Sequence, residues 1–261
     1  MKTKGYISYY NAQASLGRSF LHPGARWATE NLLSLIPGPN SGSQLLELGC
    51  GLGHSAKLFL DRFPVSYLGI DSSSRMLRKA EKLLRSYGAR ARLLQCDLTS
   101  GALPFQSGSF EVIIAESVLG ILNSKAVIAE CHRVLKKGGI LAVNERIWGT
   151  RLNEEDRKSL NAECLESLGF PAASEDLATS AEWKNLFEVT GFMVSRMQKL
   201  EMDRLEGKTH KMPDANHMRK LWQCLLDPLT LSVLIKDRRV ARRYAHLWNK
   251  MEAWLFIATK I

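Results

Sequence analysis

The sequence predicts a doubly wound α/β domain, with a mostly parallel sheet covered by helices on both faces. From residue 44 onward, short apolar runs of strand length alternate with amphipathic helical stretches. Several of these runs are apolar on both faces, as buried parallel strands are. A glycine-rich turn follows the first run directly, in the segment LLELGCGLG that starts at Leu45. Parallel strands need crossover helices, so the sheet is expected to lie between two helical layers.

The elements of this core follow one another at short intervals. A helix is expected from Pro23 to Ile36, where the segment PGPN ends it. The helix over 124–135 is expected to end at Gly138 and Gly139. Strands are expected at 44–48, 66–71, 92–97, 110–115 and 140–145.

The C-terminal part departs from this alternation. Helices are expected from Asn153 and from Thr179, the latter with the spacing of a capping box, and a sixth strand follows at 192–197. A helical insertion then precedes a closing strand, which gives seven strands with an antiparallel last one. The predicted division is an N-terminal lid segment (1–40), a core (41–198), a helical insertion (199–253) and the closing strand of the core sheet (254–261).

The insertion has two interpretations. Apolar residues recur in it at helical spacing, namely Met218, Leu221, Trp222, Leu225 and Leu226. Packing on the core is the simpler interpretation, and an apolar substrate lid is the alternative, because long structured insertions often carry binding functions.

Composition narrows the class of protein. The N-terminus has no apolar signal-type run, no stretch is long and apolar enough to span a bilayer, and five cysteines form no CxxC pair, so a cytoplasmic protein is expected. The net charge is +10, and residues 199–261 hold 13 Lys/Arg against 7 Asp/Glu, or +6. The basic run Lys236–Arg243 favours a solvated helix face, and a surface that binds an anionic substrate is the alternative. No specific nucleic-acid partner is expected, since no recognition motif is present, and the oligomeric state stays open.

A ligand site is expected at the carboxyl ends of the strands, where an open α/β sheet binds its ligands. The turn 49–53, Asp71, Asp97 and the segment 115–117 all lie at such ends. A dinucleotide site needs GxGxxG, but His54 stands where the third glycine would be. Glu47 is also a poor neighbour for a pyrophosphate, because carboxylates favour cations. A ligand with an ammonium, a sulfonium, a ribose and an adenine suits this set better.

These segments resemble the class I S-adenosylmethionine-dependent methyltransferases. The matching pieces are LLELGCGLG, YLGIDSSSRML, LLQCDLTSGALPFQSGSFEVIIA and ECHRVLKKGGILAVNE, in the order and spacing of the family. The resemblance is closest to the small-molecule branch that includes the ubiquinone and menaquinone biosynthesis enzymes. It implies a Rossmann-like fold, S-adenosyl-L-methionine as cofactor with S-adenosyl-L-homocysteine as product, and a small-molecule methyl acceptor. The cysteine spacing predicts no metal, and a basic, apolar lid would suit an apolar or anionic metabolite as the acceptor.

The resemblance also implies a role for each matching residue. Glu47 and the backbone of Gly49, Cys50 and Gly51 would hold the methionyl portion, and Gly53 would allow the next helix to approach closely. Asp71 would accept both ribose hydroxyls, as a carboxylate with two oxygens can. The other implied contacts are Ser72 and Met76 beside the adenine or ribose, Asp97 with Cys96 and Leu98 around the adenine, and Ala115, Glu116 and Ser117 at the methionyl amine and the route to the substrate.

Catalysis by this family is an in-line displacement that needs a base only for some acceptors. His22 and Tyr10 are the candidate catalytic residues, with His22 better placed because this segment folds over the cofactor in relatives. The remaining candidates are expected to be structural, with His54 opening a helix and pointing away from the methyl group; these are Tyr9, His54, His210, His217 and His246. Gly120 replaces a bulkier residue of relatives, so the wall there is expected to be more open. The alternatives are an RNA or protein methyltransferase and a non-catalytic S-adenosylmethionine-binding protein.

Overall fold

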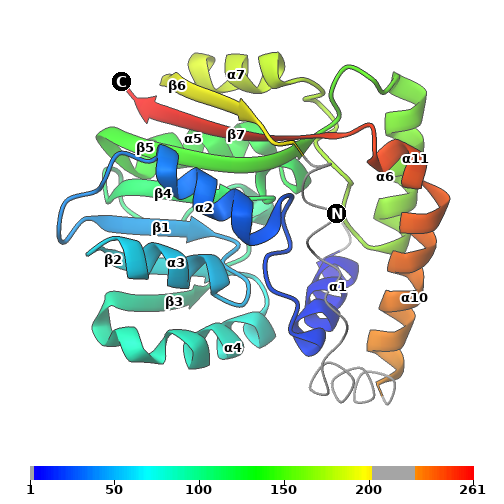
Figure 1. The fold of residues 1–261 in the computed structure, drawn as a ribbon, viewed down its shortest axis with the longest axis horizontal. Helices are drawn as coiled ribbons and strands as arrows, with labels where there is room; N and C mark the ends of the chain where they lie inside the picture. Colours follow the sequence, from blue (N-terminus) through cyan, green and yellow to red (C-terminus); the bar gives the residue numbers. More distant parts are fainter. Residues whose placement is uncertain (1–2, 202–226) are drawn as a thin grey trace.

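The computed structural model of the chain describes residues 3–201 and 227–261. Its centre is one seven-stranded sheet with the order β3-β2-β1-β4-β5-β7-β6 (Figure 1). The strands are β1 Gln44–Leu48, β2 Ser66–Asp71, β3 Ala91–Gln95, β4 Phe110–Glu116, β5 Leu135–Ile147, β6 Phe192–Lys199 and β7 Glu252–Lys260. Strands β1 to β5 pair in parallel, whereas β7 runs antiparallel to both β5 and β6. The predicted sheet with its antiparallel last strand is confirmed.

Helices cover both faces of the sheet. On one face lie α2 Ala25–Leu35, α3 His54–Arg62 and α4 Ser74–Leu84, and on the other lie α5 Ser124–Val134 and α7 Ser180–Val189. Leu32 and Phe59 are buried on the first face, and Trp183 and Phe187 on the second. Three short 3₁₀ segments connect strands to helices: η1 Arg85–Arg90, η2 Leu98–Ser100 and η3 Leu119–Ile121.

The strand order reverses between β1 and β4, and this switch point is where doubly wound sheets form their ligand crevice. Four further helices stand together at the carboxyl ends of the parallel strands, on the right in Figure 1. They are α1 Thr3–Leu16, α6 Glu154–Ser167, α10 Pro228–Arg243 and α11 Ala245–Trp248. The crevice therefore has a helical wall opposite the sheet.

Three details differ from the sequence-based expectation. Helix α1 was not predicted. Helix α5 ends at Val134 instead of reaching Gly138, because Leu135 already belongs to β5 and pairs with Phe110 of β4. The residues between Leu135 and Ile140 form an irregularity in this pairing. Strand β3 is an edge strand with largely exposed side chains rather than a strand buried on both faces.

The basic run Lys236–Arg243 lies on α10, where most of its side chains are exposed. Arg239 and Arg243 approach the Glu163 carboxylate of α6 at 3.5 and 3.2 Å, so part of this charge serves to pair helices. Within the described residues, no helix combines the length and apolar character that crossing a lipid bilayer requires. The predicted apolar stripe from Met218 to Leu226, and both His210 and His217, lie outside the described residues.

Candidate active site

The glycine turn after β1 has three residues in the left-handed region, Gly49, Gly51 and Gly53, with φ of +67°, +52° and +79°. A Cβ on Gly49 would lie 2.6 Å from Cγ2 of Val118, and a Cβ on Gly53 would lie 3.1 Å from the Cβ of Ala80 on α4. A Cβ on Gly51 would meet nothing within 4 Å, although this backbone borders the cavity described below. The glycines thus allow the turn to pack closely against α4 and the segment after β4, and they leave the backbone at Gly51 accessible from the cavity.

Replacing Gly49 by alanine is expected to lower the free energy of unfolding by about 2–3 kcal/mol, because backbone strain adds to overlap with Val118. The matched control is Gly42→Ala, since Gly42 has φ of +83° but nothing within 4 Å of an added Cβ. Strain alone should cost that variant about 1–2 kcal/mol. Urea unfolding followed by circular dichroism measures both, and equal losses would contradict the packing argument.

Asp71 ends β2 and fixes the glycine turn to it. Its Oδ2 accepts a hydrogen bond from the Gly51 N–H at 2.9 Å, and its Oδ1 accepts one from the Ser73 N–H at 2.8 Å. Burial raises the pKa of this carboxyl, against the lowering effect of the two N–H groups. Each oxygen keeps a lone pair for a further donor, so Asp71 can still bind two hydroxyl groups.

Glu47 lies on β1 with 3% of its surface exposed. The Tyr67 hydroxyl donates a hydrogen bond to its Oε2, and Oε1 has no hydrogen-bond partner within the part of the chain that the structure describes. Burial raises the pKa of Glu47 well above its ordinary value, and the negative charges of Glu116 and Asp71 raise it further. A cation bound beside these acids would therefore be stabilised.

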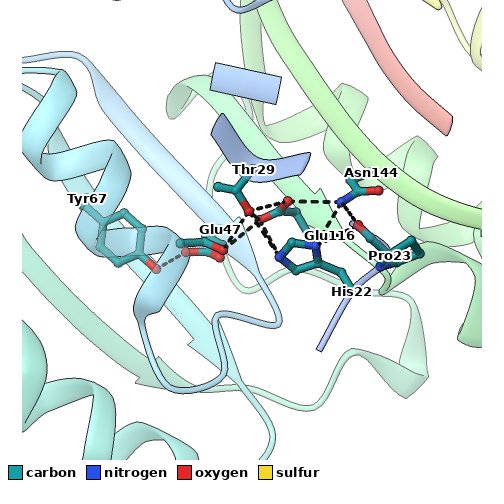
Figure 2. A network of polar contacts seen from close by, with 8 residues as sticks. His22, Pro23, Thr29, Glu47, Tyr67, Glu116 and Asn144 are labelled. Carbon is teal, nitrogen blue, oxygen red and sulfur yellow. Dashed lines mark hydrogen bonds and ion pairs between the residues drawn. The ribbon is translucent and has the colours of Figure 1, made fainter. Parts of the chain in front are cut away.

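Glu116, at the end of β4, is the centre of a buried polar network (Figure 2). Its carboxylate accepts hydrogen bonds from Thr29 Oγ1 at 3.0 Å, Ser55 Oγ at 2.7 Å and Asn144 Nδ2 at 3.3 Å. His22 lies in the same network, with Nε2 at 3.1 Å from Thr29 Oγ1 and Nδ1 at 3.0 Å from Asn144 Nδ2. The network connects the N-terminal segment and α2 to two central strands.

These residues border a first cavity with about 670 Å³ of space free of atoms, its opening to solvent included. The predicted residues that line it are Tyr10, His22, Glu47, Gly49, Cys50, Gly51, Asp71, Met76, Glu116 and Ser117. Residues that were not predicted also line it, namely Tyr6, Arg18, Phe20, Leu21, Leu52, His54, Ser55, Val118 and Ile121. His54 opens α3 as predicted and lines this cavity, and its orientation away from the methyl group stays a prediction.

Six predicted contacts lie outside this lining. Asp97 is exposed and accepts a hydrogen bond from the Thr99 N–H at 2.9 Å, which caps η2. Gly53 packs on α4 as described, and the other four are Ser72, Cys96, Leu98 and Ala115. Burial raises the pKa of Tyr6, and the negative charges of Asp71 and Asp97 raise it further. The roles of these six residues stay predictions.

Helix α1 supplies the part of the site that the sequence reasoning missed. Asn11 Oδ1 accepts a hydrogen bond from Ser73 Oγ at 2.8 Å, and Ser15 Oγ accepts one from Arg75 at 2.7 Å, so α1 is fastened to α4. Tyr6 and Tyr10 both reach the first cavity, and their rings pack with a centroid distance of 4.8 Å. The i, i+4 spacing of these two tyrosines was the available sequence signal for a helix here.

A second cavity adjoins the first. The two share Tyr10, Leu21, Ser117 and Ile121 as lining residues. The second has about 1130 Å³ of free space, including open solvent, and extends between α1, the end of β5, the segment after α6, α10 and α11. Ser117 lies where they meet, with φ of +56° and a buried Oγ that has no hydrogen-bond partner in the described chain. A strained residue with an unpaired polar atom at such a junction is typical of a functional site.

Glu145 lies at the carboxyl end of β5 in the wall of the second cavity and is 2% exposed. Burial raises its pKa to about 7, although it accepts a hydrogen bond from the Leu119 N–H at 3.0 Å. A Cβ on Gly120 would lie 3.1 Å from its Oε1. Gly120 therefore packs against Glu145 instead of opening the cavity wall, which corrects the sequence-based expectation for this residue.

The raised pKa of Glu145 has a consequence for stability. The folded state holds this proton more tightly than the unfolded chain does, so Glu145 costs stability progressively as the pH rises from about 4.5 to about 7. We expect the unfolding free energy of Glu145→Gln, relative to wild type, to increase by about 2–3 kcal/mol between about pH 5 and about pH 8. Urea unfolding at a series of pH values measures this difference. A difference that does not vary with pH would show that Glu145 ionises normally.

The residues that line the first cavity fit a cationic adenosyl ligand. Three carboxylates line the first cavity, burial raises the pKa of two of them, and Gly51 presents backbone without a side chain. A pyrophosphate would meet Glu47 and Glu116 at close range, which disfavours a dinucleotide. Within the described residues no cluster of three or more His, Cys, Asp or Glu side chains could hold a metal ion.

Comparison with known proteins agrees with this fit. Residues 45–139 match the profile of a family described as a methyltransferase domain. An uncharacterized methyltransferase of Bacillus subtilis is 26% identical over 97% of this chain and 100% of its own length. A demethylmenaquinone methyltransferase of Tropheryma whipplei is 35% identical over 41% of this chain and 44% of its own. The crystal structure of a [4+2]-cyclase, SpnF, has a TM-score of 0.73 at 19% identity and covers 98% of this chain and 94% of that one.

The fold and the site together define a Rossmann-like methyltransferase domain. Residues 45–139 form a methyltransferase domain, and the comparisons support the predicted resemblance to the class I S-adenosylmethionine-dependent methyltransferases. The match to a menaquinone enzyme is in keeping with the predicted resemblance to the quinone branch. The likeness to the cyclase shows the shared fold alone.

Proposed function

We propose that the chain transfers a methyl group from S-adenosylmethionine in the first cavity to a small-molecule acceptor in the second. The observation that carries this proposal is the shared wall, since ligands in cavities that have Tyr10, Leu21, Ser117 and Ile121 in common would adjoin each other. The second cavity is lined by apolar and aromatic side chains together with a few charged groups, as small-molecule sites are. The name of the Tropheryma whipplei relative supports an acceptor of this kind.

Each end of the donor has candidate partners. Asp71 would accept the ribose hydroxyls, while its bonds from Gly51 and Ser73 keep the carboxylate in place. Glu47 would pair with the ammonium of the methionyl portion, and the backbone of Gly49, Cys50 and Gly51 would lie along it. The remaining proposed contacts are Ser72, Met76, Cys96, Asp97 and Leu98 around the adenine or ribose, and Ala115, Glu116 and Ser117 toward the acceptor, with Gly53 allowing α4 to pack closely.

When bound, S-adenosylmethionine supplies a methyl group on a sulfonium, which is already a good leaving group. The protein therefore contributes alignment and exclusion of water, and alignment alone can be worth about 7–11 kcal/mol. Tyr6 and Tyr10 of α1 border the first cavity and would shield the bound donor from solvent. A lid role for the N-terminal segment is part of this proposal.

The two predicted catalytic residues differ in what they can do. Both ring nitrogens of His22 already lie within 3.1 Å of Thr29 or Asn144, so we propose that His22 positions the network. Tyr10 lines both cavities, and burial raises its pKa well above the ordinary value. Its hydroxyl therefore stays protonated and would donate a hydrogen bond to the acceptor. A cytoplasmic site of action also stays part of the proposal, in keeping with four free cysteines in the described residues.

The test supplies methyl-labelled S-adenosylmethionine and an extract of the source organism separated into low-molecular-mass, protein and RNA fractions. The proposal predicts that label enters the low-molecular-mass fraction only. Label in RNA or protein would instead support a macromolecular acceptor. Binding of S-adenosylmethionine without transfer to any fraction would support a non-catalytic binding protein.

A further inference from the structure

The second cavity contains an arginine whose guanidinium makes no ion pair with a carboxylate of the described residues. Arg146, on β5 next to Glu145, is half-buried and lines this cavity together with Trp248 of α11. Its guanidinium carbon lies 5.2 Å from the centre of the Trp248 ring. Among residues 3–201 and 227–261, no carboxylate lies within 4.0 Å of the guanidinium and no acceptor takes a hydrogen bond from it.

The other arginine of the two cavity walls is paired. Arg18 lies 3.7 Å from the Asp237 carboxylate, which itself borders the second cavity. Burial lowers the pKa of Arg146, against the raising effect of the negative charge of Glu145, so its surroundings solvate the cation poorly. Five donor hydrogens on a poorly solvated cation are costly unless a partner arrives, so the arrangement favours an anion from outside the chain.

Two acids in the same wall limit the charge of that anion. Asp237 is engaged by Arg18, and Glu145 is held by backbone N–H groups with a pKa near neutrality. One unpaired cation beside two carboxyl groups matches a single negative charge and disfavours a dianion. The planar fork of a guanidinium fits a carboxylate with two parallel hydrogen bonds.

We infer that the methyl acceptor carries a carboxylate, which Arg146 binds in the second cavity while the apolar part of the acceptor packs against Phe170 and Trp248. This inference rests on the proposed function, because it assigns the acceptor class of the same site. Arg146 would act as a specificity-determining residue. The aromatic rings of Tyr9, Phe170 and Trp248 give that wall the apolar surface that such an acceptor needs.

The test measures binding of benzoate, benzamide and phenyl phosphate by calorimetry to the full chain saturated with S-adenosylhomocysteine. Benzoate should bind the wild-type chain at least about 10-fold more tightly than benzamide and more tightly than phenyl phosphate. Arg146→Met should weaken benzoate binding by about 10- to 100-fold. Arg242→Met removes an exposed arginine of α10 and should leave benzoate binding unchanged.

Two further measurements separate the possible failures. The affinity for S-adenosylhomocysteine and the unfolding transition should be the same in both variants and in wild type, which excludes a folding defect. If S-adenosylhomocysteine binds but benzoate does not, or binds Arg146→Met as tightly as wild type, the carboxylate inference is overturned alone. Tighter binding of phenyl phosphate would overturn it in favour of a phosphorylated acceptor. Loss of S-adenosylhomocysteine binding in the wild-type chain would instead overturn the proposed function.

Discussion

Replacing Asp71 by alanine is expected to weaken S-adenosylmethionine binding by roughly 100-fold or more. Two hydrogen bonds to a charged acceptor are lost, each worth about 1.5–3 kcal/mol. The same carboxylate also holds the Gly51 N–H at 2.9 Å, so its removal loosens the turn that approaches the donor. Asp71→Asn keeps one acceptor oxygen and should show a smaller loss. Titration calorimetry measures the affinities.

The control for this prediction is Asp61→Ala, which removes an acid of the exposed face of α3 and changes the net charge equally. We expect that variant to bind S-adenosylmethionine as wild type does. An Asp71→Ala variant that is folded and keeps the wild-type affinity would show that the carboxylate at the end of β2 does not bind the ribose.

Replacing Glu116 by alanine is expected to lower the free energy of unfolding by about 4–5 kcal/mol. Glu116 has 8% of its surface exposed, and its carboxylate accepts hydrogen bonds from Thr29, Ser55 and Asn144. Without it, the short hydrogen bond of Ser55 is lost, and Thr29 and Asn144 each lose one partner while keeping His22, at about 1–3 kcal/mol for each loss before relaxation. Urea unfolding followed by circular dichroism measures the loss.

Two variants bracket this effect. Glu116→Gln keeps an acceptor oxygen and should lose about half as much or less. Glu188→Ala removes a surface carboxylate that pairs with Lys184 at 3.5 Å, and should change stability by about 0.5 kcal/mol or less. Equal stability of Glu116→Ala and Glu188→Ala would contradict the view that the network in Figure 2 holds the N-terminal segment on the sheet.

The parts of the fold that sequence could predict are those set by local patterns. The glycine turn, the strand Gln44–Leu48 and the capping box at Thr179 depend on neighbours a few residues away, and each has the predicted bounds. The switch point follows from strand order, which the alternation of strands and helices restricts strongly. The sequence alone could therefore predict that Glu47 and Asp71 lie at the same ligand site.

What could not be predicted depends on contacts between distant segments. Helix α1 is held by α4 and α10, and its tyrosines enter the site only through that packing. Arg146 meets Trp248 because α11 lies against the end of β5, which no local pattern encodes. The same holds for the network around Glu116, since His22, Thr29 and Asn144 come from three separate elements.

The central claim is that the first cavity recognises a positively charged adenosyl donor through its carboxylates. Titration calorimetry of the full chain with S-adenosylmethionine, S-adenosylhomocysteine and NAD tests it most directly. We predict binding of S-adenosylmethionine and S-adenosylhomocysteine at one site and no binding of NAD. Binding of NAD, or no binding of either adenosyl compound by the folded chain, would contradict the claim.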